Sequence, residues 1–388
     1  MATAQAPNPV QLAQQNMLQR QAVLGNALKM KQQIFSQSVD PTTQPIININ
    51  SSAIRNVGLL LGFIVEVTGD VTSGHVGVAA RTPFGNANMV KQFQFNDLSN
   101  YTRIQVPGWY LALLNSVRQQ FGYGGVYANN IPMGYGENLP VYQGSATIAI
   151  DTTETLRMMY YVPISYSSTD LRGAIYMSTV SATANLQITL NATPFTAAGN
   201  AIDYIYTNNA AGAWTDTVNV TVYQVYLDQI PRMPNGQPIL PMLDLNTVYD
   251  LKQTTFVGPT QAQDFPMPYS NYRSFLSTVA VYDNGGTYDP DGSNVNYFSL
   301  ASANFTNIWK VTPEIIGLDA RMAIMTDFPA ATYFFESRDI PINTINYGNM
   351  ELNINANGAV NAGARVLVGY ESFALVNQLV GATSLAGG

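Results

Sequence analysis

The hydrophobic positions of this chain change their spacing near residue 45. From Asn8 to Phe35 apolar residues recur at helical spacing, whereas after Pro45 they alternate with polar residues, as they do along a β-strand. The alternation is clearest at Val218, Val220 and Val222, whose neighbours in the chain are mostly polar. We therefore predict a helical N-terminal segment followed by a strand-rich body.

The strand pattern occurs in two blocks. In the first block we predict strands near residues 58–68, 74–80, 91–97, 101–106, 146–151, 155–164, 185–190 and 217–229. In the second block we predict strands near residues 273–282, 295–301, 305–311, 331–337, 342–347, 350–355 and 364–374. Many short strands separated by Gly, Pro and Asn are typical of a sandwich or a jelly roll rather than of βαβ units.

Each block contains a few helical signals. One covers residues 109–120, and Thr312-Pro313-Glu314 is a strong start for another that runs through residues 315–325. Weaker helical patterns lie near residues 169–178 and 335–346. Their similar places in the two blocks favour an internal duplication.

A proline-rich linker, residues 231–249, separates the blocks. The strand pattern runs to Ile230 and then breaks at Pro231, Pro234, Gly236, Pro238 and Pro241, before a short helical signal. We predict a helical arm at 1–45, one strand-rich unit at 46–231, a linker helix with a second unit at 232–380, and a flexible tail at 381–388.

Composition and charge exclude several classes of function. Only 11% of the 388 residues are charged and the net charge is −7, so the body lacks the basic surface that direct nucleic-acid binding needs. The chain has no cysteine, which excludes disulfides, thiolate zinc sites and cysteine nucleophiles. Low charge also lets copies approach closely, although an ordinary polar surface explains the composition equally well.

The N-terminal arm carries the clearest functional signal in the sequence, a possible membrane contact. It has three cations and no acid before Asp40, which suits an anionic membrane surface. The alternative is a helix that packs on its own barrel or on a neighbouring subunit. The predicted membrane-proximal residues are the cations and the narrow apolar stripe beside them: Arg20, Lys29, Lys31, Val10, Met17, Leu24 and Leu28.

The search for a catalytic or metal site gives little. His75 is the only histidine, and its glycine-rich flanks are typical of a hairpin edge. Asp283, Asp289 and Asp291 form the best metal candidate, but the calcium-loop pattern fails at Phe298, and an Asx-rich turn is the more common explanation. We therefore expect no enzymatic activity, no cofactor and no resident metal.

Several long segments resemble the major capsid protein of the tectiviruses, tailless icosahedral phages with a membrane inside the capsid. They occur in matching order over nearly the whole chain. The strongest are TVYQVYLDQIP with GQPILPMLDLNTVYDL across the linker, YYVPISYSSTDLRGAI (160–175), FLSTVAVYDNGG (275–286), MTDFPAATYFFESRDIPINTINYGN (325–349) and ARVLVGYESF (364–373).

The resemblance implies an all-β fold with a few short helices: two tandem jelly-roll β-barrels plus an N-terminal amphipathic helix. It also implies a major capsid protein made in the host cytoplasm and built into the virion. Three chains would form a homotrimer of pseudo-hexagonal outline. Its expected partners are neighbouring capsid trimers, vertex (penton) and minor capsid proteins, and the internal viral membrane, which the arm would contact.

A jelly-roll receptor-binding or carbohydrate-binding viral spike protein is the alternative, because jelly rolls also host lectins. An enzyme on a β-sandwich is disfavoured, because no nucleophile–base pair is recognisable in the sequence. The sequence thus predicts a structural protein that acts by self-assembly.

Overall fold

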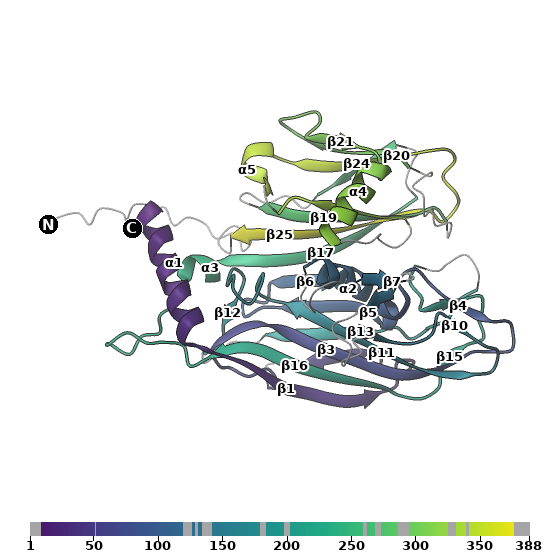
Figure 1. Ribbon diagram of the computed structural model, residues 1–388, viewed down its shortest axis with the longest axis horizontal. Helices are drawn as coiled ribbons and strands as arrows, with labels where there is room; N and C mark the ends of the chain where they lie inside the picture. Colours follow the sequence, from purple (N-terminus) through teal and green to yellow (C-terminus); the bar gives the residue numbers. More distant parts are fainter. Residues whose placement is uncertain are drawn as a thin grey trace.

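The computed structural model describes most of the chain, and two strand-rich bodies lie side by side in it, with a helix standing at one end (Figure 1). The described residues are 9–50, 52–118, 126–128, 131–133, 142–178, 184–197, 202–258, 262–267, 273–285, 295–324, 331–338 and 341–375.

The first body is a jelly roll of eight main strands in two sheets. One sheet has the order β1-β16-β3-β11 and the other the order β2-β13-β5-β6. The strands are β1 (Leu28–Val39), β2 (Ile46–Ile49), β3 (Leu59–Thr72), β5 (Val90–Asn96), β6 (Thr102–Val106), β11 (Thr153–Pro163), β13 (Asn185–Leu190) and β16 (Val218–Asp228).

Short strands and a 3-10 turn complete the rims of this first barrel. They are β4 (Ala79–Arg81), η1 (Gly85–Met89), β7 (Val126–Ala128), β8 (Ile131–Met133), β9 (Tyr142–Gln143), β10 (Thr147–Ile148), β12 (Ile175–Tyr176), β14 (Tyr206–Thr207) and β15 (Ala213–Trp214). Helix α2 (Gly108–Val117) follows β6 and is buried along its whole length.

The second body repeats the same strand order. Its sheets are β17-β25-β19-β22 and β18-β24-β20-β21, so first, eighth, third and sixth strands again share one sheet. The strands are β17 (Thr247–Val257), β18 (Ala262–Pro266), β19 (Ser274–Asp283), β20 (Val295–Ser302), β21 (Trp309–Val311), β22 (Thr332–Glu336), β23 (Ile342–Asn343), β24 (Met350–Ala356) and β25 (Arg365–Leu375). The duplication is therefore present at the level of topology.

Helices occupy equivalent places in the two barrels. In each, one helix follows the fifth main strand: α2 in the first barrel and α4 (Pro313–Ile324) in the second. The remaining helices are α1 (Pro9–Asn26), α3 (Met242–Leu245) in the linker, and α5 (Thr344–Tyr347).

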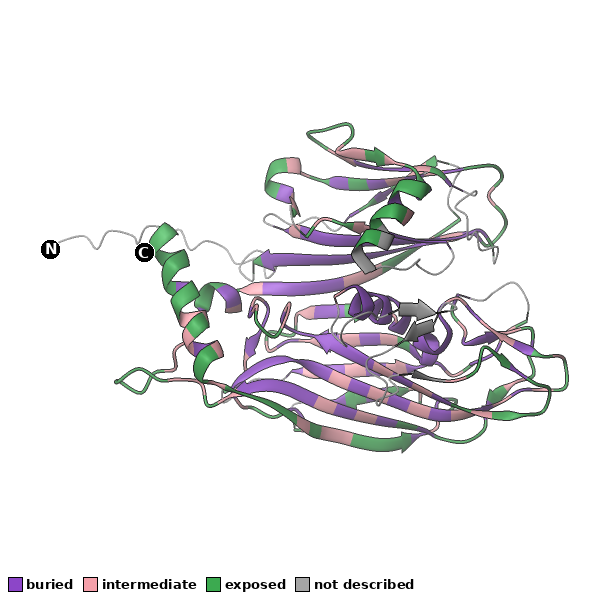
Figure 2. Ribbon diagram, in the orientation of Figure 1, coloured by how far each residue is buried: buried purple, intermediate pink, exposed green. Residues whose placement is uncertain are grey.

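The two barrels are joined through their sheets. Strand β6 of the first barrel pairs in parallel with β17 of the second, at Ile104 with Leu251 and Gln105 with Lys252. The sheet β2-β13-β5-β6 thereby continues into β17-β25-β19-β22. One apolar cluster accordingly holds residues of both barrels, among them Phe93, Tyr110 and Leu367. Figure 2 shows this continuous buried region between the two bodies.

The N-terminal prediction needs a correction. The helix ends at Asn26, and Leu28 to Val39 form β1, which pairs antiparallel with β16. The predicted helical arm at 1–45 is therefore wrong beyond residue 26, and the first barrel begins at Leu28 rather than at residue 46. Pairing with a neighbouring strand decides the conformation here, because helical spacing in a polar segment is only a weak preference.

The structure also corrects several smaller predictions of strands and helices. The sequence pattern missed β2, β17 and β18, and residues 169–178 form turns with the two-residue strand β12 instead of a helix. In the predicted strand 342–347 only Ile342 and Asn343 are extended, and α5 follows. The predicted tail 381–388 lies outside the described residues.

Candidate assembly surfaces

A buried ion cluster ties α2 to the second barrel. Arg118, at the C-terminal end of α2, pairs with Glu371 on β25 and with Glu336 on β22. The Glu371 carboxylate also accepts hydrogen bonds from the hydroxyls of Tyr249 (2.6 Å) and Ser277 (2.7 Å). Glu371 is fully buried, so each of its donors offsets the cost of removing this charge from water.

The carboxylates of this cluster change the pKa of the groups that donate to them. Burial by itself lowers the pKa of Arg118, but the charge of Glu371 and the hydrogen bonds to both carboxylates raise that pKa above its ordinary value. Burial and the same carboxylate raise the pKa of Tyr249 well above its ordinary value, so its hydroxyl remains a donor. The cluster is therefore a fixed structural joint.

Three further polar contacts cross the same junction. Tyr101 of the first barrel donates to Asp250 of the second at 3.0 Å, and Lys252 donates to the carbonyl oxygen of Thr102. Burial, followed by the charge of Asp250, raises the pKa of Tyr101 to about 12. The third contact is an ion pair of Arg365 with Asp203 at 2.7 Å.

Close backbone packing completes the junction. A Cβ added at Gly369 on β25 would lie 2.5 Å from the ring of Tyr110 on α2. Only glycine lets the helix approach the strand this closely. The two barrels are therefore joined by a shared sheet, by helix α2 and by buried charge.

The arm is clamped to the linker. Arg20 pairs with both carboxylate oxygens of Asp244 in α3, at 2.6 and 2.5 Å. Asn16 donates to Asp244 at 2.9 Å and accepts from the backbone N–H of Leu243. The hydrogen bond to Asp244 raises the pKa of Arg20 above its ordinary value. The structure thus gives this predicted membrane-facing cation a structural partner.

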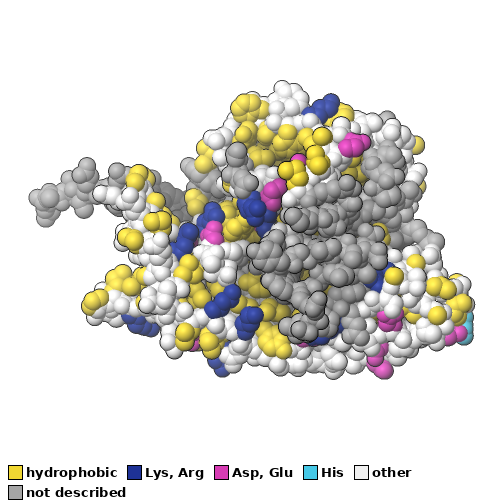
Figure 3. Space-filling view, in the orientation of Figure 1, with side chains coloured by type: hydrophobic (Ala, Val, Ile, Leu, Met, Phe, Trp, Pro, Cys, Tyr) yellow, Lys and Arg dark blue, Asp and Glu magenta, His cyan; other side chains and the backbone are white. Residues whose placement is uncertain are grey.

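The other predicted arm residues differ in their exposure and in the element on which they lie. Val10, Met17 and Leu28 are about half exposed or more, whereas Leu24 packs on a small cluster that contains Val23 and Leu227. Leu28, Lys29 and Lys31 lie on β1 instead of a helix. Burial, and then the neighbouring charge of Lys31, lowers the pKa of Lys29. Figure 3 shows hydrophobic side chains along α1 with basic side chains near its base.

No described helix is long and apolar enough to cross a membrane. Separately, helix α1 has one face fixed on the linker through Arg20 and another face of exposed apolar side chains, among them Val10 and Met17.

Of the metal candidate, only Asp283 lies in the described part of the chain. Asp283 is buried and accepts from Nε of Arg365 at 2.9 Å, so its carboxylate is engaged in an ion pair. Asp289 and Asp291 lie outside the described residues. Among the residues that are described, no group of three His, Cys, Asp or Glu side chains could hold a metal ion.

His75 lies on an exposed segment beside Asp151, with Nδ1 2.5 Å from a carboxylate oxygen. Its side chain is 89% exposed, which is a poor setting for acid–base chemistry because water surrounds the pair. The contact lies at the protein surface.

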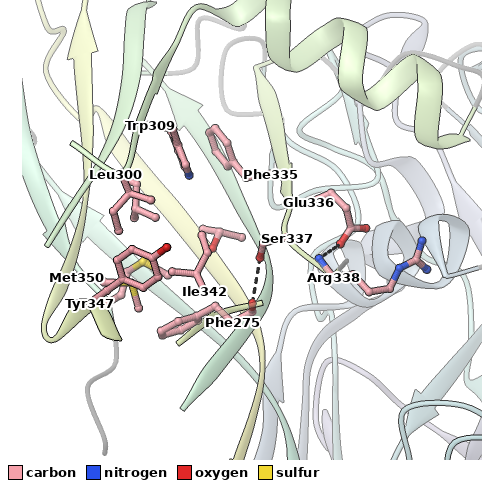
Figure 4. A pocket seen from close by; sticks show the side chains of 13 residues that line it. Phe275, Leu300, Trp309, Phe335, Glu336, Ser337, Arg338, Ile342, Tyr347 and Met350 are labelled. Carbon is pink, nitrogen blue, oxygen red and sulfur yellow. Dashed lines mark hydrogen bonds between the residues drawn. The ribbon is translucent and has the colours of Figure 1, made fainter. Parts of the chain in front are cut away.

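A cavity of about 370 Å³ opens in the second barrel (Figure 4). Its apolar wall includes Phe275, Trp309 and Tyr347. Two of its polar groups have partners: the Ser337 hydroxyl donates to the carbonyl oxygen of Phe275 at 3.0 Å, and Glu336 pairs with Arg118. Both groups are therefore engaged within the fold.

The residues that join the barrels were missed at the sequence level. Glu371 and Asp250 each interrupt an apolar strand, in LVGYESF and TVYDL. A lone acid within a buried strand predicts a buried partner, and this signal could have found the acids. Their partners Arg118 and Arg273 are 253 and 23 residues away, so no spacing rule identifies them.

Comparison with known proteins agrees with this geometry. A family model described as the N-terminal part of the P3 major capsid protein matches residues 1–230, and one for its C-terminal part matches residues 246–387. The chain is 37% identical over 376 residues to the major capsid protein P3 of Enterobacteria phage PRD1, covering 96% of this chain and 94% of that protein.

Solved structures share the fold. The major capsid protein of Sulfolobus Turreted Icosahedral Virus gives a TM-score of 0.60 at 12% identity, covering 90% of this chain and 97% of that one. The PBCV-1 protein VP54 gives a TM-score of 0.55 at 10% identity, covering 90% and 94%. With two tandem jelly rolls and these sequence matches, the chain belongs to the family of P3 major capsid proteins, structural components of the phage virion.

Proposed function

We propose that this major capsid protein forms a homotrimer of pseudo-hexagonal outline, which tiles the shell with neighbouring trimers and with vertex and minor capsid proteins. The observation that supports the proposal is the rigid pairing of two barrels of equal topology. Three such chains in a ring present six similar barrels, and a ring with threefold symmetry closes because each head-to-tail contact repeats.

Sedimentation velocity with light scattering on the purified chain at neutral pH tests the trimer. We expect a single species of three times the 42.2 kDa chain mass. A strictly monomeric chain at high concentration would overturn the proposal.

The arm is proposed to face the internal viral membrane. Its exposed Val10, Met17 and Leu18 can enter the headgroup region, and Lys29 and Lys31 add about 1 kcal/mol each near anionic lipid. Arg20 contributes less than the sequence predicts, because Asp244 already neutralises it.

Flotation with anionic vesicles tests this role. The chain with Met17→Glu and Leu18→Glu should bind vesicles at least tenfold more weakly, while its trimers remain intact. The variant Val76→Glu, which changes a residue that is 70% exposed on another surface, is the control. Equal vesicle binding by all three proteins would exclude a membrane role for these residues.

Absence of catalysis is part of the proposal. The Ser337 and Glu336 side chains in the apolar cavity of the second barrel are bonded within the fold, and the only histidine of the sequence lies in solvent. One result would contradict this absence of catalysis. It is hydrolytic activity toward glycan or ester substrates that co-purifies with the wild-type protein and is lost on a single substitution in the chain.

A further inference from the structure

One end of the second barrel is open where the equivalent end of the first barrel is filled. In each barrel a two-residue strand follows the sixth main strand and pairs with the start of the third. In the first barrel this strand is β12, which places Ile175 beside Leu60, and both residues are buried in the core with Met177. In the second barrel it is β23, which places Ile342 beside Phe275. Here Ile342 is half-exposed and lines the cavity of about 370 Å³.

The wall of this cavity is apolar from its floor outward. Phe275, Leu300 and Met350 are buried and form the floor. Trp309 is half-exposed and stacks on Phe335, with 4.8 Å between the ring centroids. Figure 4 shows these five side chains around one space. An apolar ligand would therefore meet apolar contacts on several sides.

An exposed apolar rim leads into the cavity. Tyr347 on α5 lines the cavity, and the ring of Phe305 packs on it with 5.5 Å between centroids. Phe305 is 51% exposed, and Ile345 on the same short helix as Tyr347 is 60% exposed. Apolar surface thus continues from the outside of the barrel to the cavity floor.

Charge lies to one side of the cavity. Of the described residues that line it, only Glu336 and Arg338 are charged. Glu336 pairs with Arg118, and the Arg338 guanidinium points away from the apolar residues (Figure 4). A charged group deep in the cavity would lose its water without gaining a partner there, so the site favours an uncharged, apolar ligand.

The cavity lies at the end of the molecule that carries α1. Helix α1 packs on α3, directly before β17. Thr247, the first residue of β17, pairs with Leu375 at the end of β25. Close to that end, Phe373 pairs with Ser274, the first residue of β19, and Phe275 of the cavity floor follows. Figure 1 shows α5 at this same end.

We propose that the cavity binds one aliphatic chain, belonging to a fatty acid or to a membrane lipid. Its volume lies at the lower end of the range of about 300–1,000 Å³ that is usual for small-ligand sites, which suits a single unbranched chain. Binding removes the apolar wall and the chain from water, while the polar head stays outside the rim. Under the proposed membrane role of α1, the viral membrane is the nearest source of such a chain, but binding itself does not require that role.

Trp309 is a built-in reporter of the site. The purified chain is titrated with stearic acid that carries two bromine atoms near the middle of its chain, because bromine quenches indole fluorescence on contact. We expect saturable quenching that disappears in Trp309→Phe, which keeps an aromatic ring beside Phe335. The other two tryptophans, Trp109 and Trp214, are buried in the core of the first barrel and should not respond.

A charge in the wall tests the site further. Ile342→Glu should weaken binding of the brominated acid at least about tenfold, because a carboxylate in the wall repels an apolar chain. The matched control is Val257→Glu, which changes an apolar residue that is 80% exposed at the other end of the same barrel. It should bind like wild type. Circular dichroism checks that both variants are folded.

Several results would overturn the site: quenching of wild type that does not saturate, equal quenching in Trp309→Phe, or unchanged binding by folded Ile342→Glu. The wild-type titration and Trp309→Phe decide the question by themselves if Ile342→Glu does not fold.

Vesicles of phosphatidylglycerol with brominated acyl chains distinguish the two sources. Quenching of Trp309 by these vesicles would support a membrane lipid as the ligand, and quenching by the free acid alone would support a fatty acid. If wild type does not float with vesicles but the free acid quenches Trp309, the membrane role fails and the site stands. Flotation without quenching by either probe would overturn the site and leave the membrane role intact.

Discussion

At the scale of single residues, the fold depends on a few charges in a chain that has few of them. Glu371 accepts from Arg118, Tyr249 and Ser277, so one carboxylate links the helix of one barrel to three strands of the other. Asp244 likewise links the arm to the linker helix, by accepting hydrogen bonds from Asn16 and Arg20. Buried charge is costly by itself, so its value lies in fixing one arrangement of barrels.

The substitution Glu371→Gln should therefore be strongly destabilising. It leaves Arg118 buried with only Glu336, and we expect a loss of about 3 to 5 kcal/mol in the free energy of unfolding, measured by urea titration. The double variant Arg118→Met, Glu371→Leu should recover most of this loss, because it removes both charges. An equal loss in the single and double variants would show that packing, and not the ion pair, dominates.

At the scale of elements, strand pairing decides conformations that local sequence leaves open. Residues 28–35 carry a helical spacing of apolar positions, yet they form part of β1 because β16 offers an antiparallel partner along that strand. The residue before β3 is a glycine because the neighbouring strand lies too close for a side chain. Gly58 has φ +53°, and a Cβ there would lie 1.8 Å from the carbonyl oxygen of Leu227 on β16.

The pair Gly58→Ala and Gly236→Ala separates backbone strain from crowding. Both residues have positive φ, but nothing lies within 4 Å of a Cβ at Gly236. Gly236→Ala should cost about 1–2 kcal/mol for the left-handed backbone alone, and Gly58→Ala at least about 2 kcal/mol more. Thermal unfolding followed by circular dichroism measures both; equal melting temperatures would contradict the predicted clash.

At the scale of the whole molecule, the linker is a fixed spacer. Its hairpin is closed by hydrogen bonds from Met233 N–H to Gln237 and from Ile239 N–H to Pro231, both 2.8 Å long. The clamp of Asp244 holds its helical end. Since the two barrels also share a sheet, their relative position is set by contacts and not by chain length.

Limited proteolysis tests this rigidity. Residues 231–249 should resist trypsin in the trimer, although Arg232 is exposed in the single chain, because cleavage requires a bound hairpin to open. Mass spectrometry of the fragments identifies the cut sites, and the chain in urea is the control that shows Arg232 to be cleavable. Early cleavage at Arg232 in intact trimers would mean that the linker is flexible.

The sequence by itself determined the strand-rich class, the position of the linker and the kinship to phage capsid proteins. These follow from period-two patterning, proline breaks and long matching segments, all of which are local. Only the tertiary structure decided that residues 28–39 are a strand, that Arg20 belongs to Asp244, and that Arg118 meets Glu371 across 253 residues. The reason is physical: strand pairing and buried charge depend on distant partners, and spacing along the chain does not encode them.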